Sequence, residues 1–441
     1  MPKRATKASF DHFSWENNSF KFFYSWDDKI SFKHEVTLSD LPTSINPNTH
    51  PDWEAFALNL GLSRFPYYFA PVNPKVIDIK AGKLDKNALN LWRSWYVNGL
   101  GEYFFKNNLP LALNITNSAK KEFRLSRKKI KSNSSLLLNG GGKDSAVSGE
   151  IAKMAEIRYV WFILNNNIPR DSIVKNSPVT TRILAKGITQ NPKNYALEYL
   201  GYVYKGHQPL SIYLAAVSTL ASYLFSHKYI ITSNEKSANE ANVSYRNKLI
   251  NHQYTKSFKF EKQYHSYTKK YLNEDLYYYS ILRPLYEIQI VKLFSRFPQY
   301  HKWFVSCNQG VKSNTWCTKC SKCSFIFLAL YPFIDTHKLT GIFGENLLDK
   351  ESLLDDYLSL TGEKNFKPFD CVGTTKESLL AMYLASKKEN PPFIVRYFME
   401  NTNINKGEKL TSLLSNYDNT NLISSIWAPE IKKIIQKLLN Y

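Results

Sequence analysis

A glycine turn between a strand pattern and a helix pattern carries the clearest chemical signal in the chain. Leu136, Leu137 and Leu138 are typical of the end of a buried strand, and apolar residues recur at helical spacing after residue 145. Such a turn directs free backbone N–H groups and the positive end of a helix dipole at one point, which favours phosphate binding. The turn consists of Gly140, Gly141, Gly142, Lys143, Asp144 and Ser145.

The side chains of this turn predict a nucleotide site. We expect the three glycines to bring the backbone against a leaving diphosphate, and Lys143 and Ser145 to contact phosphate oxygens. Asp144 could hold a magnesium ion that bridges two phosphates. The spacing differs from that of the common P-loop, because Asp144 separates Lys143 from Ser145. A purely structural glycine turn is the alternative.

Four of the five cysteines form a second group with chemical meaning. They lie within 17 positions and contain two overlapping Cys-x-x-Cys steps, a spacing that suits tetrahedral coordination of zinc. A site with four sulfur ligands has no open position, so we expect the zinc to be structural. An iron–sulfur cluster and redox-active thiols are the alternatives. The four residues are Cys307, Cys317, Cys320 and Cys323.

A polar segment follows a third strand pattern, at residues 229–233. Ligands of parallel sheets lie beyond the carboxyl ends of the strands, so this segment is expected to hold a polar substrate. Glu235 or Glu240 could complete a magnesium site with Asp144. His252 and Lys256 could bind a carboxylate or act as acid or base. The candidate substrate residues are Asn234, Glu235, Asn239, Glu240, Asn251 and His252.

Strand and helix patterns alternate around these residues, which predicts an α/β fold with a doubly wound parallel sheet. Residues 159–164 and 229–233 read as buried strands, and residues 210–225 read as a buried helix between them. Aromatic strands at 20–26 and 30–33 and a helix at 92–107 predict an N-terminal α+β region. From about residue 260 the chain is mostly helical in pattern, with Glu377 in capping-box register after Thr374.

These patterns predict three domains. The first is an N-terminal α+β domain at residues 1–115. The second is a nucleotide-binding α/β domain at residues 130–300. The third, at residues 301–441, contains the four cysteines and a helical C-terminal region.

Composition limits the class of protein and its partners. The chain has 441 residues, 43% of them hydrophobic, and a formal net charge of +21, which favours anionic partners such as nucleic acid or a substrate with phosphates and carboxylates. The apolar run at 210–225 is interrupted by polar residues and is too short to span a bilayer. No signal peptide follows Met1, and five cysteines do not form a disulfide framework, so a reducing cytoplasm is expected.

The glycine turn resembles the loop of the ATP pyrophosphatases, the adenine nucleotide α-hydrolase-like group. That resemblance implies cleavage of ATP between its α and β phosphates. The group usually has Ser where this chain has Gly140, which removes one hydroxyl contact and keeps the backbone cradle. The cysteine arrangement is similar to that of 7-cyano-7-deazaguanine synthase, an enzyme with the same loop, so the two motifs support each other.

An ordered series of motifs resembles one family more closely, the UDP-N-acetyl-α-D-muramoyl-L-alanyl-L-glutamate epimerases of peptidoglycan synthesis. The resemblance implies an ATP- and magnesium-dependent inversion of the terminal L-glutamate of UDP-MurNAc-L-Ala-L-Glu, with release of AMP and diphosphate. An enzyme that adenylates a nucleobase or tRNA is the alternative, and nucleic acid is the less favoured partner. The motifs are residues 96–103, 140–145, 206–209, 234–240, 251–256, 306–308, 316–323 and 367–373.

The residue that would take the α-proton stays open at this stage. Lys143, Asp144, His252 and Lys256 are the candidate catalytic residues, and the last two of these could also act as base. The other candidates are Tyr254, His207 and Cys371, of which Cys371 also fits a buried core position.

Overall fold

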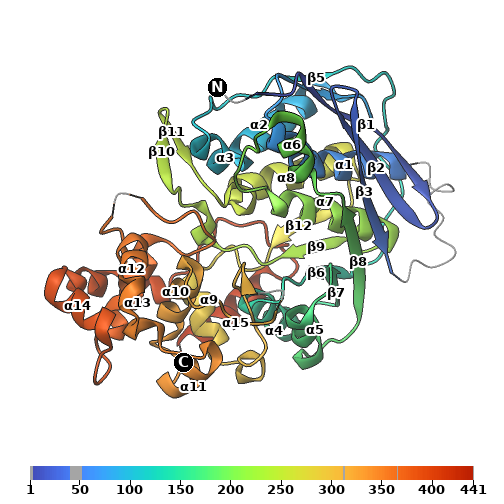
Figure 1. The fold of residues 1–441 in the computed structure, drawn as a ribbon. Helices are drawn as coiled ribbons and strands as arrows, with labels where there is room; N and C mark the ends of the chain where they lie inside the picture. The colour runs from blue at the N-terminus through green and yellow to red at the C-terminus, as the bar shows by residue number, and fades with distance from the viewer. Residues whose placement is uncertain (1–2, 40–51, 311–312, 365, 441) are drawn as a thin grey trace.

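A single ten-stranded sheet runs through the N-terminal two thirds of the protein. The computed structural model describes residues 3–39, 52–310, 313–364 and 366–440 (Figure 1). The strands lie in the order β12 (Tyr277–Ser280), β9 (Tyr229–Thr232), β6 (Ser135–Leu138), β7 (Tyr159–Leu164), β8 (Arg182–Thr189), β3 (Ile30–Leu38), β2 (Ser19–Trp26), β1 (Lys7–Glu16), β4 (Val76–Ile79) and β5 (Ile115–Asn117).

The half of the sheet from β12 to β8 is parallel throughout, which confirms the predicted α/β fold. The chain passes from β6 outward to β7 and β8, and then returns to the other side of β6 to form β9 and β12. The strand order therefore reverses between β6 and β9. Ligands of open α/β sheets bind at such a reversal, and the glycine turn and the polar segment after β9 both begin there.

The other half of the sheet begins as an antiparallel meander of β1, β2 and β3. Strand β3 pairs with β8, where Leu38 lies opposite Ala185, so the sheet is continuous between the first two predicted domains. Strand β4 then pairs with β1, and β5 with β4, both in parallel. The division at residues 1–115, 130–300 and 301–441 stays a prediction.

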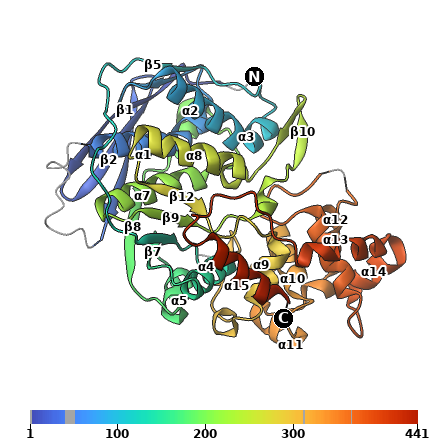
Figure 2. The ribbon, with the colours of Figure 1, turned by 180° about the vertical axis from the view of Figure 1, so that it is seen from behind.

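Helices cover both faces of the sheet (Figures 1 and 2). Neighbouring residues of a strand face opposite layers. In β6, Leu136 packs into one core cluster and Leu137 into the other. The Leu136 side holds α1 (Trp53–Phe69), α2 (Lys86–Gly99), α7 (Leu210–Leu224) and α8 (Phe258–Tyr271), and the Leu137 side holds α4 (Lys143–Met154), α5 (Ile168–Asn176), α9 (Glu287–Phe294) and α10 (Ser321–Leu330).

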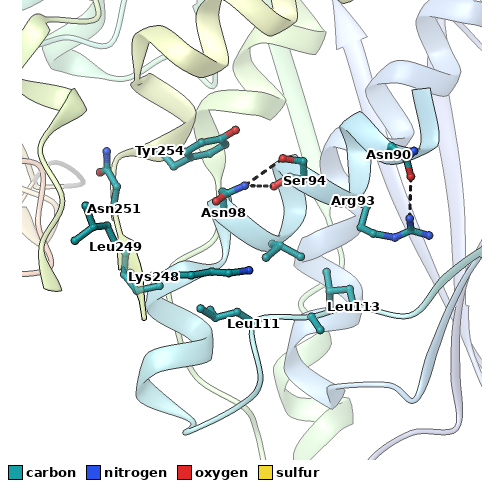
Figure 3. A pocket seen from close by; sticks show the side chains of 13 residues that line it. Asn90, Arg93, Ser94, Asn98, Leu111, Leu113, Lys248, Leu249, Asn251 and Tyr254 are labelled. Atoms are coloured by element: carbon teal, nitrogen blue, oxygen red, sulfur yellow. Dashed lines mark hydrogen bonds between the residues drawn. The ribbon is translucent and has the colours of Figure 1, made fainter. Parts of the chain in front are cut away.

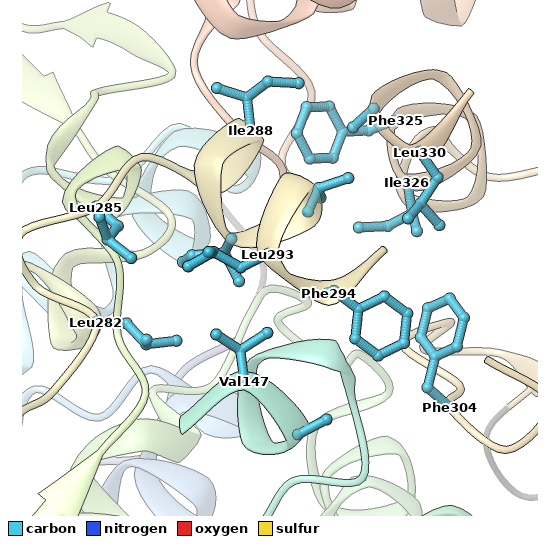
Figure 4. Close-up of a cluster of buried hydrophobic side chains, with 14 of the residues drawn as sticks. Val147, Leu282, Leu285, Ile288, Leu293, Phe294, Phe304, Phe325, Ile326 and Leu330 are labelled. Carbon is cyan, nitrogen blue, oxygen red and sulfur yellow. The ribbon is translucent and has the colours of Figure 1, made fainter. Parts of the chain in front are cut away.

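The C-terminal region is helical, as expected, and its core is continuous with the Leu137 face of the sheet. Figure 4 shows α9 between Val147 of α4 and Phe325 and Ile326 of α10. The predicted capping box is confirmed, because Thr374 and Glu377 satisfy each other's backbone N–H groups at 2.7 and 3.2 Å. The remaining helices are α11 (Thr336–Phe343), α12 (Leu354–Thr361), α13 (Thr375–Ala385), α14 (Phe393–Asn401) and α15 (Ala428–Asn440).

The helix expected at 92–107 is two helices in the structure, α2 and α3 (Gly101–Lys106), separated at Leu100. The glycines on either side of the break pack closely against other segments. A Cβ on Gly99 would lie 3.0 Å from Pro209, and one on Gly101 would lie 2.9 Å from Ile250. Two short elements complete this neighbourhood: helix α6 (Pro192–Leu200) and the hairpin of β10 (Val243–Tyr245) and β11 (Lys248–Ile250). Among the described residues, no helix has the length and apolar character needed to cross a membrane.

Candidate active site

The glycine turn forms an open cradle at the N-terminus of α4. Gly142 is the N-cap residue and offers no side chain, so the N–H groups of the first turn have no side-chain cap. Gly141 has a φ of +83°, and a Cβ there would lie 3.0 Å from the backbone nitrogen of Arg170. A Cβ on Gly142 would lie 2.8 Å from Oγ of Ser306. Gly141 therefore requires glycine, Gly142 packs against the Ser306 hydroxyl, and the cradle suits an anion.

Side chains at the two ends of the turn hold its shape. Oδ1 of Asn139 accepts a hydrogen bond from the N–H of Gly141 at 2.8 Å, and Oγ of Ser145 accepts one from the N–H of Gly140 at 2.9 Å. The Ser145 hydroxyl keeps its own proton for donation to a phosphate oxygen. A Cβ on Gly140 would meet only this hydroxyl, at 3.9 Å, so the chain has room there for the serine that the wider group carries.

Lys143 lies beneath the cradle rather than in solvent. Its side chain is 1% exposed, and Nζ lies 2.5 Å from Oδ1 of Asp144 and 2.7 Å from Oε1 of Glu287. Burial raises the pKa of Glu287 to about 8, with the negative charges of Asp144 and Glu235 acting in the same direction against Lys143. Oε2 of Glu287 is buried without a hydrogen-bond partner among the described residues. A buried carboxylate oxygen in this position fits a bound cation.

The buried ion pair of Arg283 and Glu261 positions two further charged residues beside this cradle. Arg283 binds the Glu261 carboxylate at 2.6 and 2.8 Å. Its remaining N–H groups donate to the backbone oxygen of Glu235 at 2.5 Å and to that of Lys256 at 2.7 Å. Arg283 therefore joins the segment after β9 to the 3-10 turn Tyr254–Lys256, and holds both residues beside the cradle.

The Lys256 ammonium lies among negative groups without forming an ion pair. No carboxylate oxygen of the described residues lies within 4 Å of its Nζ. Burial opposes its charge, but Cys371, Glu235 and Asp144 raise its pKa, in that order. Lys256 is thus a cation between the nucleotide cradle and Cys371.

The other polar residues of this segment hold its shape. Glu240 accepts hydrogen bonds from Nζ of Lys367 at 2.9 Å and from the N–H of Thr375 at 3.3 Å. Asn239 accepts from the first N–H of α8, Asn251 donates to the Ala238 carbonyl, and Asn234 donates to Thr232. Their predicted contact with substrate stays a prediction.

His252 belongs to a buried cluster on the far side of Lys256. Its Nδ1 lies 2.5 Å from Oε2 of Glu102, and its ring also interacts with the Cys371 side chain. The His207 ring lies over it, with the ring centroids 4.1 Å apart. Lys106 also binds Glu102, at 2.5 Å.

The charges of this cluster favour an imidazolium and a thiolate. Burial lowers the pKa of His252, but Cys371 and Glu102 outweigh it and raise the pKa to about 9. Burial likewise opposes the Cys371 thiolate, but Lys256 and His252 lower its pKa to about 6. Burial lowers the pKa of His207 to about 3, so that ring is neutral. A neutral histidine, an imidazolium and a thiolate therefore lie together.

The four cysteines predicted to bind metal converge. Their sulfur atoms lie within 4.8 Å of one another, with 3.6 Å between Cys317 and Cys323 and 3.5 Å between Cys320 and Cys323. All four are free of disulfides. A tetrahedral ion about 2.3 Å from each sulfur would separate the sulfurs by about 3.8 Å, so the donor set fits zinc.

The cysteine lobe contacts both parts of the site. The Val305 N–H donates to the Gly141 carbonyl at 3.4 Å, and Asn308 donates to the Asp370 side chain at 3.1 Å. The first contact braces the nucleotide cradle, and the second fixes the segment that carries Cys371.

A pocket of about 390 Å³ opens beside the His252 segment. Figure 3 shows Lys248 pointing into it from β11, opposite Arg93 and Asn98 of α2. Tyr254 and Asn251, the neighbour of His252, also line the pocket. The pocket thus combines two cations with amide groups, which suits an anionic, hydrogen-bonding ligand.

Two family models match this chain. The family model described as the MurL N-terminal domain matches residues 3–281, and the model described as the MurL C-terminal domain matches residues 303–409. The chain belongs to the MurL family.

Curated relatives of this MurL family member carry the name UDP-N-acetyl-alpha-D-muramoyl-L-alanyl-L-glutamate epimerase. The protein of Xanthomonas oryzae is 33% identical over 340 residues, which is 73% of this chain and 72% of the relative. That of a Micromonospora species is 30% identical over 331 residues, with the same two coverages. That of Salinispora tropica is 30% identical over 311 residues, 69% of this chain and 67% of the relative. No solved structure matches significantly.

Sequence reasoning missed three residues of this MurL site. Glu102, Glu287 and Arg283 each act through a partner more than 20 positions away. Only Glu102 had a signal, because it lies within the 96–103 motif. The motifs at 96–103, 206–209, 251–256 and 367–373 all meet at His252, and a Cβ on Gly206 would lie 2.6 Å from Tyr103.

Proposed function

We propose that this protein inverts the terminal L-glutamate of UDP-MurNAc-L-Ala-L-Glu to D-glutamate, with cleavage of ATP to AMP and diphosphate. The observation that carries this proposal is the uncapped N-terminus of α4 beside Lys143 and Asp144, in a chain whose curated relatives are named as this epimerase. The product would be a precursor of peptidoglycan.

The chemistry explains why such an epimerase needs a nucleotide. Removal of an α-proton beside a free carboxylate places a second negative charge next to the first. ATP supplies an adenylyl group that cancels the carboxylate charge and makes the α-carbon more acidic. Hydrolysis of the mixed anhydride then returns the carboxylate.

The chain provides groups that would bind the leaving diphosphate and the magnesium ion. The N–H groups of the glycine turn would bind the leaving diphosphate, and Lys143 would neutralise it from below. Asp144, with Glu235 or Glu287, would hold magnesium, and the unpartnered Oε2 of Glu287 supports this assignment. Glu240 is less suited, because Lys367 already neutralises it.

The nucleotide-sugar part of the substrate would occupy the pocket beside α2. That part carries a diphosphate, and Lys248 and Arg93 offer positive charge to it. From this pocket, the His252 segment leads toward Lys256, where the glutamyl end would lie. The net charge of +21 agrees with a substrate that bears phosphates and carboxylates.

Zinc in the four-cysteine site would be structural. All four ligand positions are supplied by sulfur, so no position is open for substrate. Cys307, Cys317, Cys320 and Cys323 would then fix the lobe that braces Gly141 and Asp370.

The direct test incubates the purified protein with ATP, magnesium and UDP-MurNAc-L-Ala-L-Glu and determines the chirality of the glutamate. We expect D-glutamate and AMP in equal amounts, with AMP release dependent on the dipeptide. Absence of both products would overturn the proposal. Salt-dependent retention on tRNA together with tRNA-dependent AMP release would favour the nucleobase-modifying alternative instead.

A further inference from the structure

The cluster around His252 contains a reactive-cysteine arrangement that ATP cleavage does not use. Cys371 is half-buried between Phe369, whose ring centroid lies 6.4 Å from that of His252, and Val372, whose carbonyl accepts a hydrogen bond from Gln253 at 3.1 Å. The nearby positive charges of Lys256 and His252 lower the pKa of its thiol. His252 is in turn fixed by Glu102 at 2.5 Å. A cysteine beside a charged histidine that a carboxylate orients is the arrangement that activates a thiolate.

We propose that Cys371 is the base that removes the α-proton of the activated glutamyl residue, with His252 and Glu102 as its positioning residues and Lys256 as the acid that returns a proton. This inference rests on the proposed function and assigns its proton-transfer groups. It also reverses the earlier interpretation of Cys371 as a core residue.

The Cα–H bond breaks and an S–H bond forms on Cys371, while the electron pair of the broken bond moves into the activated carboxyl group. A new Cα–H bond then forms on the opposite face with a proton from Lys256, and the electron pair returns to Cα. The Cys371 thiol and the neutral Lys256 amine recover their charges by proton exchange, so nothing is oxidised or reduced.

The position of Lys256 suits both halves of this step. Its ammonium is attracted by Cys371 on one side and by Glu235, Asp144 and Glu287 of the nucleotide cradle on the other. It therefore lies where an activated carboxyl group and its α-carbon would meet. In the resting enzyme, the Cys371 thiolate can accept a proton and the Lys256 ammonium can donate one. Conversion of L-glutamate to D-glutamate needs one base and one acid of this kind.

The fixed position of Cys371 supports a catalytic rather than a packing role. Gln253, next to His252, donates to the Val372 carbonyl at 3.1 Å. A Cβ on Gly373 would lie 2.5 Å from Phe325, so the segment packs closely on α10. The Asn308–Asp370 hydrogen bond fixes its other side. The chain thus holds this thiol against His252 and Lys256 from both neighbours.

The experiment compares the whole protein with its Cys371→Ser and Cys371→Ala variants in D₂O, with ATP, magnesium and the muramoyl dipeptide. Labelled diphosphate exchange into ATP measures carboxylate activation, and deuterium at Cα measures proton transfer. We expect both variants to keep exchange within about threefold and to lose Cα deuterium by at least about 100-fold. Near-normal deuterium incorporation in either variant would overturn the assignment of Cys371.

The same design separates this inference from the proposed function. If the unmodified protein shows no exchange of diphosphate into ATP, then carboxylate activation is wrong. If it shows exchange and epimerisation, and Cys371→Ala epimerises equally well, then only the present inference is wrong.

Alkylation of the unmodified protein tests the cluster without a folding risk. Iodoacetamide at pH 5–9, followed by peptide mass mapping, gives the titration of the Cys371 thiol. We expect a midpoint well below that of an ordinary thiol, a midpoint shifted upward in Glu102→Gln, and protection by the muramoyl dipeptide. An ordinary midpoint, or a second zinc equivalent that is lost in His207→Ala, would show that the cluster serves another purpose and would overturn the inference.

Discussion

The Glu102 carboxylate lies 2.5 Å from Nδ1 of His252, although the two residues are 150 positions apart in the chain. Their contact joins the first turn of α3 to the segment that carries Lys256. Cys371 and His207 approach the same imidazole. The Glu102 hydrogen bond therefore orients a histidine at which four separate segments of the chain meet. The charge of His252 can be tested through the pH dependence of stability.

His252→Gln should change how stability depends on pH. The pKa of His252 is raised from 6.5 to about 9 in the folded state, so its stabilising charge is fully present below pH 6.5 and is lost as the pH rises through 9. The groups that face it are Glu102, His207 and Cys371, with Lys106 and Lys256 farther out. We expect the wild type to exceed the variant by about 2–3 kcal/mol at pH 6 and by much less at pH 9.5.

Urea unfolding at pH 6, 7.5 and 9.5 provides the measurement. Exposed His337 serves as the control position, because its substitution by Gln should leave the pH dependence unchanged. A difference between wild type and His252→Gln that stays constant across this range would show that the histidine is not charged in the folded protein.

Lys143→Met should slow ATP cleavage strongly and leave the fold intact. The ammonium is the positive charge beneath the nucleotide cradle, so its loss should slow AMP release by about 10²–10³-fold. Glu287 can take up a proton when Lys143 is removed, since its pKa is already about 8, and this limits the loss of stability. Diphosphate–ATP exchange and thermal unfolding report the two effects.

A matched control lies on the same helix. Lys153 is exposed in the last turn of α4, so Lys153→Met should retain full exchange. Near-normal exchange in Lys143→Met would remove this residue from the nucleotide site.

Cys320→Ser should release the metal, whereas Cys371→Ser should not. Cys320 and its three partners fit a tetrahedral ion, and Cys371 lies outside that group. We expect about one zinc per chain in the wild type and in Cys371→Ser. In Cys320→Ser we expect loss of zinc and a lower unfolding temperature, because the lobe supports Gly141 and Asp370.

Metal analysis by mass spectrometry and a visible absorption spectrum distinguish zinc from iron. A visible absorption band together with bound iron would favour the iron–sulfur alternative. Full zinc content in Cys320→Ser would contradict the assigned ligand set.

Lys248→Ala should weaken binding of the nucleotide sugar without affecting ATP. Its ammonium points into the pocket beside His252 (Figure 3), and loss of one phosphate contact costs about 1.4 kcal/mol, or tenfold in affinity. We therefore expect KM for the muramoyl dipeptide to rise about tenfold, with KM for ATP unchanged. Lys259→Ala, an exposed change at the start of α8, is the control. An equal rise in both KM values would place the nucleotide sugar elsewhere.

The local features of this site could be predicted from the sequence. The turn at Gly140–Gly142, the cysteine spacing and the capping box at Thr374 each depend on residues a few positions apart, so a pattern can reveal them. The continuity of the sheet could not be predicted in this way. The pairing of β3 with β8 joins residues about 150 positions apart, and an aromatic strand pattern does not identify its partner.

The ion pairs of the site could not be predicted from the sequence pattern either. Glu287 lies seven residues beyond the end of β12, and only tertiary packing brings it to Lys143. The Arg283–Glu261 pair is buried, and buried charges are rare enough that a sequence pattern argues against them. Close approach of distant segments, rather than local propensity, determines these contacts.

Arg283 allows stability and positioning to be separated. Arg283→Met alone leaves the Glu261 carboxylate buried without its partner, which should cost about 3–5 kcal/mol in the free energy of unfolding. The double variant Arg283→Met/Glu261→Leu removes both charges and should recover most of that stability, as apolar replacements of buried pairs often do. The recovered protein would still lack the hydrogen bonds that Arg283 donates to the backbone oxygens of Glu235 and Lys256. We therefore expect the double variant to unfold near the wild-type urea midpoint and yet to epimerise poorly. Wild-type turnover in a stable double variant would show that Glu235 and Lys256 are positioned without Arg283.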